Sequence, residues 1–100
     1  MPRPIITEYA KDDIRQIISY IRPDSPQNAK TVRAKFKAAI QLLSEFPYIG
    51  HGRQDAGDDG LRFWSVYSYL IVYRPDAKPL RVIRVIHGAR NIGKSLWRNQ

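Results

Sequence analysis

Five side chains in the second half of the sequence have the types that metal-free RNA cleavage requires. That reaction needs a base for the 2′-hydroxyl proton, an acid for the leaving oxygen, and cations that stabilise the developing negative charge. Histidine, tyrosine and arginine can fill these roles. If the chain is an endoribonuclease, its candidate catalytic residues are Arg62, Tyr73, Arg84, His87 and Arg90.

Two of these residues have an equally simple structural interpretation. His87 precedes Gly88 at the expected end of a strand, where an imidazole often bonds to the backbone of a turn. Arg84 stands among apolar neighbours, and a buried guanidinium without a partner would be costly, so a structural salt bridge is an alternative to a binding role. The sequence leaves both alternatives open.

Other catalytic chemistries lack their residues. The chain has no cysteine, which excludes disulfides, thiol nucleophiles and cysteine zinc sites. The two histidines, His51 and His87, lie in different segments, and no serine stands in a nucleophile-elbow pattern. Asp55, Asp58 and Asp59 lie in a glycine-rich loop without calcium-loop spacing. We therefore expect no metal and no cofactor, and a target-binding protein rather than an enzyme.

The positive charge is concentrated in one part of the chain. The formal net charge is +8, but residues 61–100 hold eight basic side chains against Asp76 alone. Such asymmetry predicts an acidic partner, either a nucleic acid or an acidic protein segment, although basic residues also keep surfaces soluble. Arginine and tryptophan are enriched where partners bind. The candidate partner-binding residues are Arg62, Trp64, Arg81, Arg84, His87, Arg90 and Trp97.

The elements that would position these residues follow from hydrophobic periodicity in 100 residues, which is enough for one domain. Thr7 and Ser25 are expected to cap two helices joined by a short linker, which makes an antiparallel helical hairpin. The residues after 92 form a basic tail. We predict a strand at 3–7, helices at 8–22 and 26–46, a loop at 47–60, strands at 61–67, 69–74 and 80–87, and a tail at 93–100.

This order predicts a small α+β domain in which an antiparallel sheet packs one face on the helical hairpin. The other sheet face is expected to be available for a partner. Because successive strand residues alternate between faces, the last strand should divide into two sets. Arg81, Ile83, Val85 and His87 should share one face, and Val82, Arg84 and Ile86 the other.

Several sequence blocks, spaced from the first helix to the last strand, together carry a family resemblance. They are Ala10-x-x-Asp13-Ile14-x-x-Ile17-x-x-Tyr20-Ile21, Ser25-Pro26-x-x-Ala29, Ile40-x-x-Leu43-x-x-Phe46-Pro47-x-x-Gly50, Gly60-Leu61-Arg62, Tyr69-Leu70-Ile71-x-Tyr73-Arg74 and the run from Ile83 to Asn91. Over about residues 4–92 the chain resembles the ParE toxins of type II toxin–antitoxin modules, within the RelE/ParE superfamily. Its departures are the spacing Gly50-His51-Gly52-Arg53 and Asn91 in place of a frequent aspartate.

The resemblance implies a β-α-α-β-β-β fold and a growth-inhibiting toxin encoded beside a ParD-like antitoxin. ParE members typically inhibit DNA gyrase by stabilising its cleaved-DNA complex, whereas RelE relatives cut mRNA on the ribosome. A third possibility is a nucleic-acid-binding module that acts with its antitoxin, and operator DNA is expected as a partner only of the toxin–antitoxin complex. A cytoplasmic location, without a membrane partner, is implied.

Overall fold

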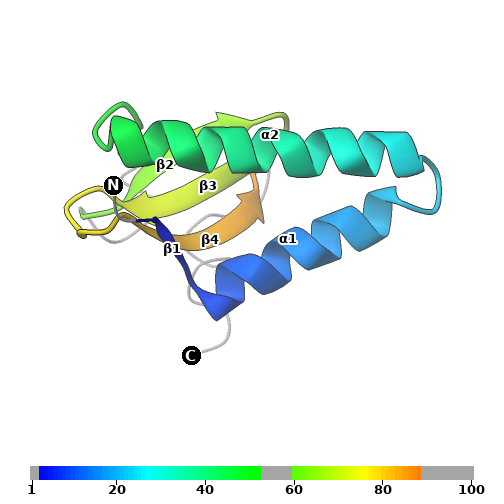
Figure 1. The fold of residues 1–100 in the computed structure, drawn as a ribbon, viewed down its shortest axis with the longest axis horizontal. Coiled ribbons are helices and arrows are strands. Elements are labelled where there is room, and N and C mark those ends of the chain that lie inside the picture. Colours follow the sequence, from blue (N-terminus) through cyan, green and yellow to red (C-terminus); the bar gives the residue numbers. More distant parts are fainter. Residues whose placement is uncertain (1–2, 53–59, 89–100) are drawn as a thin grey trace.

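The computed structural model describes residues 3–52 and 60–88, which form two helices and a four-stranded sheet (Figure 1). The order matches the predicted β-α-α-β-β-β arrangement. In chain order the elements are β1 (Ile5–Ile6), α1 (Glu8–Ile21), α2 (Pro26–Glu45), β2 (Arg62–Val66), β3 (Tyr69–Arg74) and β4 (Arg81–His87).

Both helices begin where their capping residues predict. The Thr7 hydroxyl accepts a hydrogen bond from the Ala10 N–H, and the Ser25 hydroxyl accepts one from the Asn28 N–H, each at 3.1 Å. Pro26 occupies the first helical position of α2, where its missing N–H costs nothing. The short connection turns the chain back, so that α1 and α2 meet at one end and diverge toward the other (Figure 1).

The sheet is mixed, with strand order β1-β4-β3-β2. Strands β2, β3 and β4 form the antiparallel part that was predicted, and β1 joins the edge of β4 in parallel, with Ile5 opposite Arg81. Parallel neighbours need a long crossover connection, and here the helical hairpin lies within it. Between β2 and β3 the chain reverses in a tight turn at Tyr67, whose φ of 55° is in the left-handed region.

The main core lies between the sheet and the hairpin. Helix α2 crosses one face of the sheet (Figure 1), and its buried side chains pack against those of β3 and β4. The fully buried large residues of this core include Phe36, Leu43 and Ile71. This layer holds the strands in place relative to the helices, as the amphipathic patterns predict.

The opposite face of the sheet is not open, which corrects one expectation. It carries a second buried cluster, and no member of that cluster exposes more than 6% of its surface. Because these apolar side chains are buried, the described part of this face is not open to a partner in the way that was expected. The cluster consists of Leu61, Phe63, Leu70, Val72 and Ile86, with Ile83 packed against it.

The predicted alternation along the last strand is also wrong, because β4 contains an irregularity. Val72 pairs with Arg84 and Tyr73 pairs with Val82, so that one residue of β4 is skipped. The extra residue of a β-bulge shifts the faces of the residues around it. As a result Val82 and Val85 both belong to the helix-side core, while Ile83 and Ile86 belong to the second cluster.

Beyond the short strand β1, side chains of helix α1 and its N-cap form hydrogen bonds with the backbone edge of β4. The Thr7 hydroxyl donates to the Ile83 carbonyl at 2.8 Å, and the Val85 N–H donates to the Asp13 carboxylate at 2.9 Å. These two side chains satisfy backbone groups that would otherwise lack a strand partner. Neither helix of the described part is long and apolar enough to cross a membrane.

Candidate functional site

Arg84 makes the structural salt bridge that was one of its two interpretations. Its Nε lies 2.7 Å from Asp13 Oδ2 and its Nη2 lies 3.0 Å from Oδ1, which is a bidentate pair. Both side chains are more than four-fifths buried. The hydrogen bond to Asp13 raises the pKa of Arg84 against the opposing effect of burial. Arg84 therefore joins α1 to β4.

Tyr73, another candidate catalytic residue, is fully buried. Its hydroxyl donates to the Pro47 carbonyl at 2.7 Å and accepts the Gly50 N–H at 3.0 Å. Burial raises its pKa, although the hydrogen bond from Gly50 and the nearby charge of Arg62 oppose that shift. The phenol thus holds the loop that follows α2 onto the sheet.

Arg62 holds the same loop from the neighbouring strand. Its Nη1 donates to the Gly50 carbonyl at 2.8 Å, and its guanidinium lies 5.6 Å from the centre of the Tyr48 ring, a cation–π distance. His51 adds backbone hydrogen bonds in both directions with Phe63 at the edge of β2. We call this arrangement around Gly50 the loop clasp, made by Tyr73, Arg62 and the His51–Phe63 pair.

Replacing Gly50 with alanine is expected to lower the free energy of unfolding by about 1–3 kcal/mol, because the clasp has no space for a methyl group. That group would meet the Tyr73 hydroxyl and would lie 2.8 Å from the Phe63 carbonyl oxygen. Gly52→Ala is the matched control, since no heavy atom lies within 4 Å of the position of its Cβ. Equal denaturant midpoints for the two variants would contradict the clasp.

Tyr73→Phe is expected to lower the free energy of unfolding by about 1–3 kcal/mol at neutral pH, because two loop backbone groups lose their partner. Because the pKa of Tyr73 is higher in the folded state than in the unfolded state, the unfolded phenol loses its proton at a lower pH. Wild-type stability should therefore fall as pH rises above about 10, the ordinary tyrosine pKa. Urea unfolding at pH 7 and pH 11 should show a steeper loss for wild type than for Tyr73→Phe. Tyr20→Phe, at an exposed position, should behave as wild type.

Of the candidate catalytic residues that the structure describes, His87 lies apart from Tyr73. His87 pairs with Tyr69, four residues along β3 from Tyr73 and so about 13 Å away. The His87 and Tyr69 rings stack edge to face at 5.6 Å, and His87 is exposed. The described residues contain no group of three or more potential metal-ligating side chains.

The candidate binding residues that the structure describes have different surroundings. Trp64 is half-buried and packs against the helix-side core, whereas Arg81 is exposed at the start of β4. Arg90 and Trp97 lie outside the described residues. Among the described cations of the second half, Arg62 and Arg84 make their hydrogen bonds within the fold.

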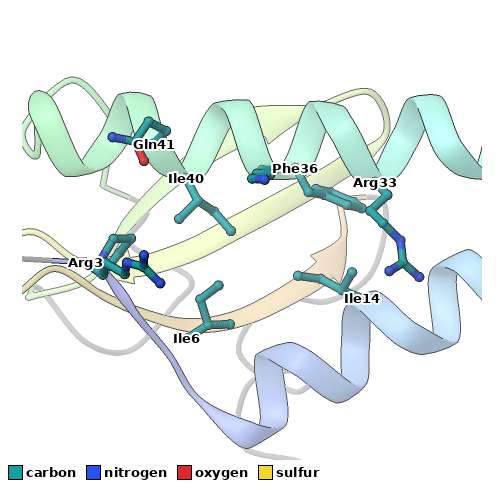
Figure 2. A pocket seen from close by; sticks show the side chains of 9 residues that line it. Arg3, Ile6, Ile14, Arg33, Phe36, Ile40 and Gln41 are labelled. Carbon is teal, nitrogen blue, oxygen red and sulfur yellow. The ribbon is translucent and has the colours of Figure 1, made fainter.

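An apolar groove of about 500 Å³ lies where the two helices diverge (Figure 2). Ile6 comes from β1, Ile14 from α1, and Phe36 and Ile40 from α2. Figure 2 shows Ile6, Ile14 and Ile40 pointing into the space between these elements. Ile6 and Ile14 are only partly buried, so that apolar surface remains accessible there.

The rim of this groove is cationic. Arg33 and Lys37 stand four residues apart on α2, and Arg3 lies at the end near β1 (Figure 2). In the described part of the chain none of the three forms an ion pair. No carboxylate occurs between Pro26 and Ser44 either. A groove with an apolar floor and unpaired cations at its rim suits a segment that is both acidic and amphipathic.

The candidate binding residues predicted from the sequence include none of the residues that line this groove. A usable signal existed, since Arg33 and Lys37 directly flank the apolar stripe residues Phe36 and Ile40. The divergence of the two helices, which opens the groove, has no local signal of that kind.

Comparisons with known proteins agree with the fold and the sequence blocks. Residues 5–92 match the family model described as the ParE toxin of the type II toxin–antitoxin system parDE. A solved structure titled as the chromosomal ParDE toxin–antitoxin system from P. aeruginosa superposes with a TM-score of 0.72 at 18% identity, over 87% of this chain and 96% of that one. No curated protein gives a significant match. The family match spans most of the sequence, and this chain belongs to the ParE toxin family of type II toxin–antitoxin systems.

Proposed function

We propose that this protein arrests growth by inhibiting DNA gyrase, stabilising the cleaved-DNA complex, and that a cognate ParD-like antitoxin neutralises it. Membership of the ParE toxin family is the observation that carries this proposal. Gyrase inhibition of this kind needs no catalytic centre in the toxin, only surfaces that bind a protein target.

The groove between the helices is the proposed antitoxin site. An acidic segment that is disordered when free would bury its apolar side chains on Ile6 and Ile14, which are only partly buried, as it folds. Its carboxylates would pair with the unpaired cations Arg33 and Lys37 at the rim. Contact with operator DNA belongs to the toxin–antitoxin complex in this proposal.

The placement of the candidate catalytic residues favours gyrase over mRNA as the target. The Tyr73 hydroxyl has both of its hydrogen bonds inside the loop clasp, and Arg84 is neutralised by Asp13. Metal-free RNA cleavage needs such groups exposed around one phosphate. That reaction would require the loop clasp to open and α1 to separate from β4.

The experiment is plasmid supercoiling and DNA cleavage by purified gyrase, with the toxin added alone or after mixing with its antitoxin. Linear DNA that accumulates with the toxin and disappears with the antitoxin is the expected result. Unchanged supercoiling and cleavage at excess toxin would contradict gyrase as the target. In that case cleaved mRNA in a translating extract treated with the toxin would identify the alternative activity.

A further inference from the structure

Four apolar or aromatic side chains at the carboxyl end of α2 and in the following loop are exposed together. Leu42, Phe46, Tyr48 and Ile49 expose 37%, 54%, 62% and 42% of their surfaces. Leu42 and Phe46 are one helical turn apart, and the Ile49 N–H donates to the Phe46 carbonyl at 3.3 Å. We call these four residues the loop patch.

The loop clasp holds the loop patch in one arrangement. Gly50, directly after the patch, is fixed through its N–H by Tyr73 and through its carbonyl by Arg62. Tyr48 lies under the Arg62 guanidinium. An exposed patch on a preorganised loop loses little conformational entropy when a partner binds, which favours affinity. Exposed tyrosine beside arginine is also the composition of binding hot spots.

The loop patch and the groove face different directions. With 100° of rotation per residue, Leu42 and Phe46 lie about 140° around α2 from Lys37 and Arg33 respectively. An acidic segment in the groove therefore leaves the patch uncovered at the helix surface. Two surfaces of different chemistry, one cationic and one nearly neutral, point to two different partners.

The charge around the loop patch identifies the kind of partner. The Arg62 guanidinium lies beside Tyr48 of the patch and donates to the Gly50 carbonyl, and Glu45 places a carboxylate next to Phe46 in the sequence. Among the described residues, the charges of Arg62 and Glu45 offset each other around the patch. The groove rim instead carries three cations, Arg3, Arg33 and Lys37, so the patch attracts a polyanion less than the rim does. We propose that the loop patch is the surface by which the toxin binds its protein target, inserting Phe46 and Ile49 into an apolar cleft of a folded protein. This inference rests on the proposed function as a toxin that acts on a protein.

The test compares growth arrest and gyrase inhibition for Phe46→Ala, Ile49→Thr and their combination with wild type. Ile49→Thr keeps the branch at Cβ and replaces the ethyl arm with a hydroxyl at a position that is 42% exposed, so we expect it to fold even if Phe46→Ala is unstable. Tyr20→Ala is the matched control, because Tyr20 is 80% exposed on α1 and belongs to neither surface. Each variant is first checked for thermal unfolding and for antitoxin binding. We expect at least a 10-fold loss of gyrase inhibition for the double variant, unchanged antitoxin affinity, and wild-type activity for Tyr20→Ala.

Folded patch variants that inhibit gyrase as wild type does would overturn the inference. Two other results would also overturn the inference. One is a loss of antitoxin binding in variants that still inhibit gyrase. The other is a wild-type dimer, detected by size-exclusion chromatography, that dissociates in these variants while inhibition is retained. If wild type arrests growth without affecting gyrase, the proposed target is wrong. The growth readout then decides the inference separately: loss of arrest in the patch variants supports it, and retained arrest contradicts it. If wild type has neither effect, both the proposed function and this inference fail.

Discussion

Replacing Asp13 with alanine is expected to lower the free energy of unfolding by about 3–5 kcal/mol, because it leaves a largely buried guanidinium, 18% exposed, without its counter-ion. The Asp13 carboxylate accepts three hydrogen bonds, two from Arg84 and one from the Val85 N–H. Removing it also leaves the edge of β4 without a partner at Val85. Since a domain of this size is typically stable by about 5–15 kcal/mol, the variant should be near unfolding at 37 °C.

The neighbouring residue provides the control for this prediction. Asp12 pairs with Arg15 at 3.7 Å, and both of these side chains are more than half exposed. Asp12→Ala should therefore change the free energy of unfolding by no more than about 0.5–1 kcal/mol. Both values come from urea unfolding followed by circular dichroism. Similar losses in Asp13→Ala and Asp12→Ala would show that the link between α1 and β4 does not depend on the Arg84 pair.

Reversing the charges at the groove rim should weaken antitoxin binding by about 100-fold. The variant is Arg33→Glu combined with Lys37→Glu, which turns the two cations of α2 beside the groove into carboxylates. An acidic segment would then meet like charges above an unchanged apolar floor. Titration calorimetry with the purified antitoxin at low and high salt measures the effect, and the salt dependence seen for wild type should largely disappear.

Lys35 offers a matched comparison on the same helix. Lys35→Glu and Lys37→Glu change the net charge equally, but only Lys37 lines the groove. Lys37→Glu should lower the affinity by about 10-fold, and Lys35→Glu should stay within about 3-fold of wild type. Equal losses for the two variants would mean that overall charge, and not this groove, attracts the antitoxin.

The secondary structure could be predicted from the sequence because its signals are local. Thr7 and Ser25 cap their helices as their side-chain chemistry favours, and the boundaries of β3 agree with its β-branched and aromatic run. The family resemblance could also be recognised from the sequence alone, because the blocks around Asp13, Gly50 and His87 could be identified by their spacing.

The site could be predicted much less well, because burial and pairing depend on distant segments. Nothing near Tyr73 in the sequence shows that its hydroxyl lies between Pro47 and Gly50. The energetic cost of burying an unpaired guanidinium predicts that Arg84 has a partner. Asp13 lies 71 positions away in the sequence, so it could not be identified as that partner. The bulge near Ile83 cannot be recognised from the alternating pattern of the sequence, and it changes which residues of β4 share a face of the sheet.

The central claim is that the chain is a growth-inhibiting toxin neutralised by an antitoxin, and growth measures it most directly. The wild-type chain is expressed in bacteria from an inducible promoter, alone or together with its proposed cognate antitoxin. Arrest on induction that is relieved by wild-type antitoxin, and not relieved when the toxin carries Arg33→Glu and Lys37→Glu, is the result we predict. Uninterrupted growth with folded, soluble toxin in the cells would contradict the account.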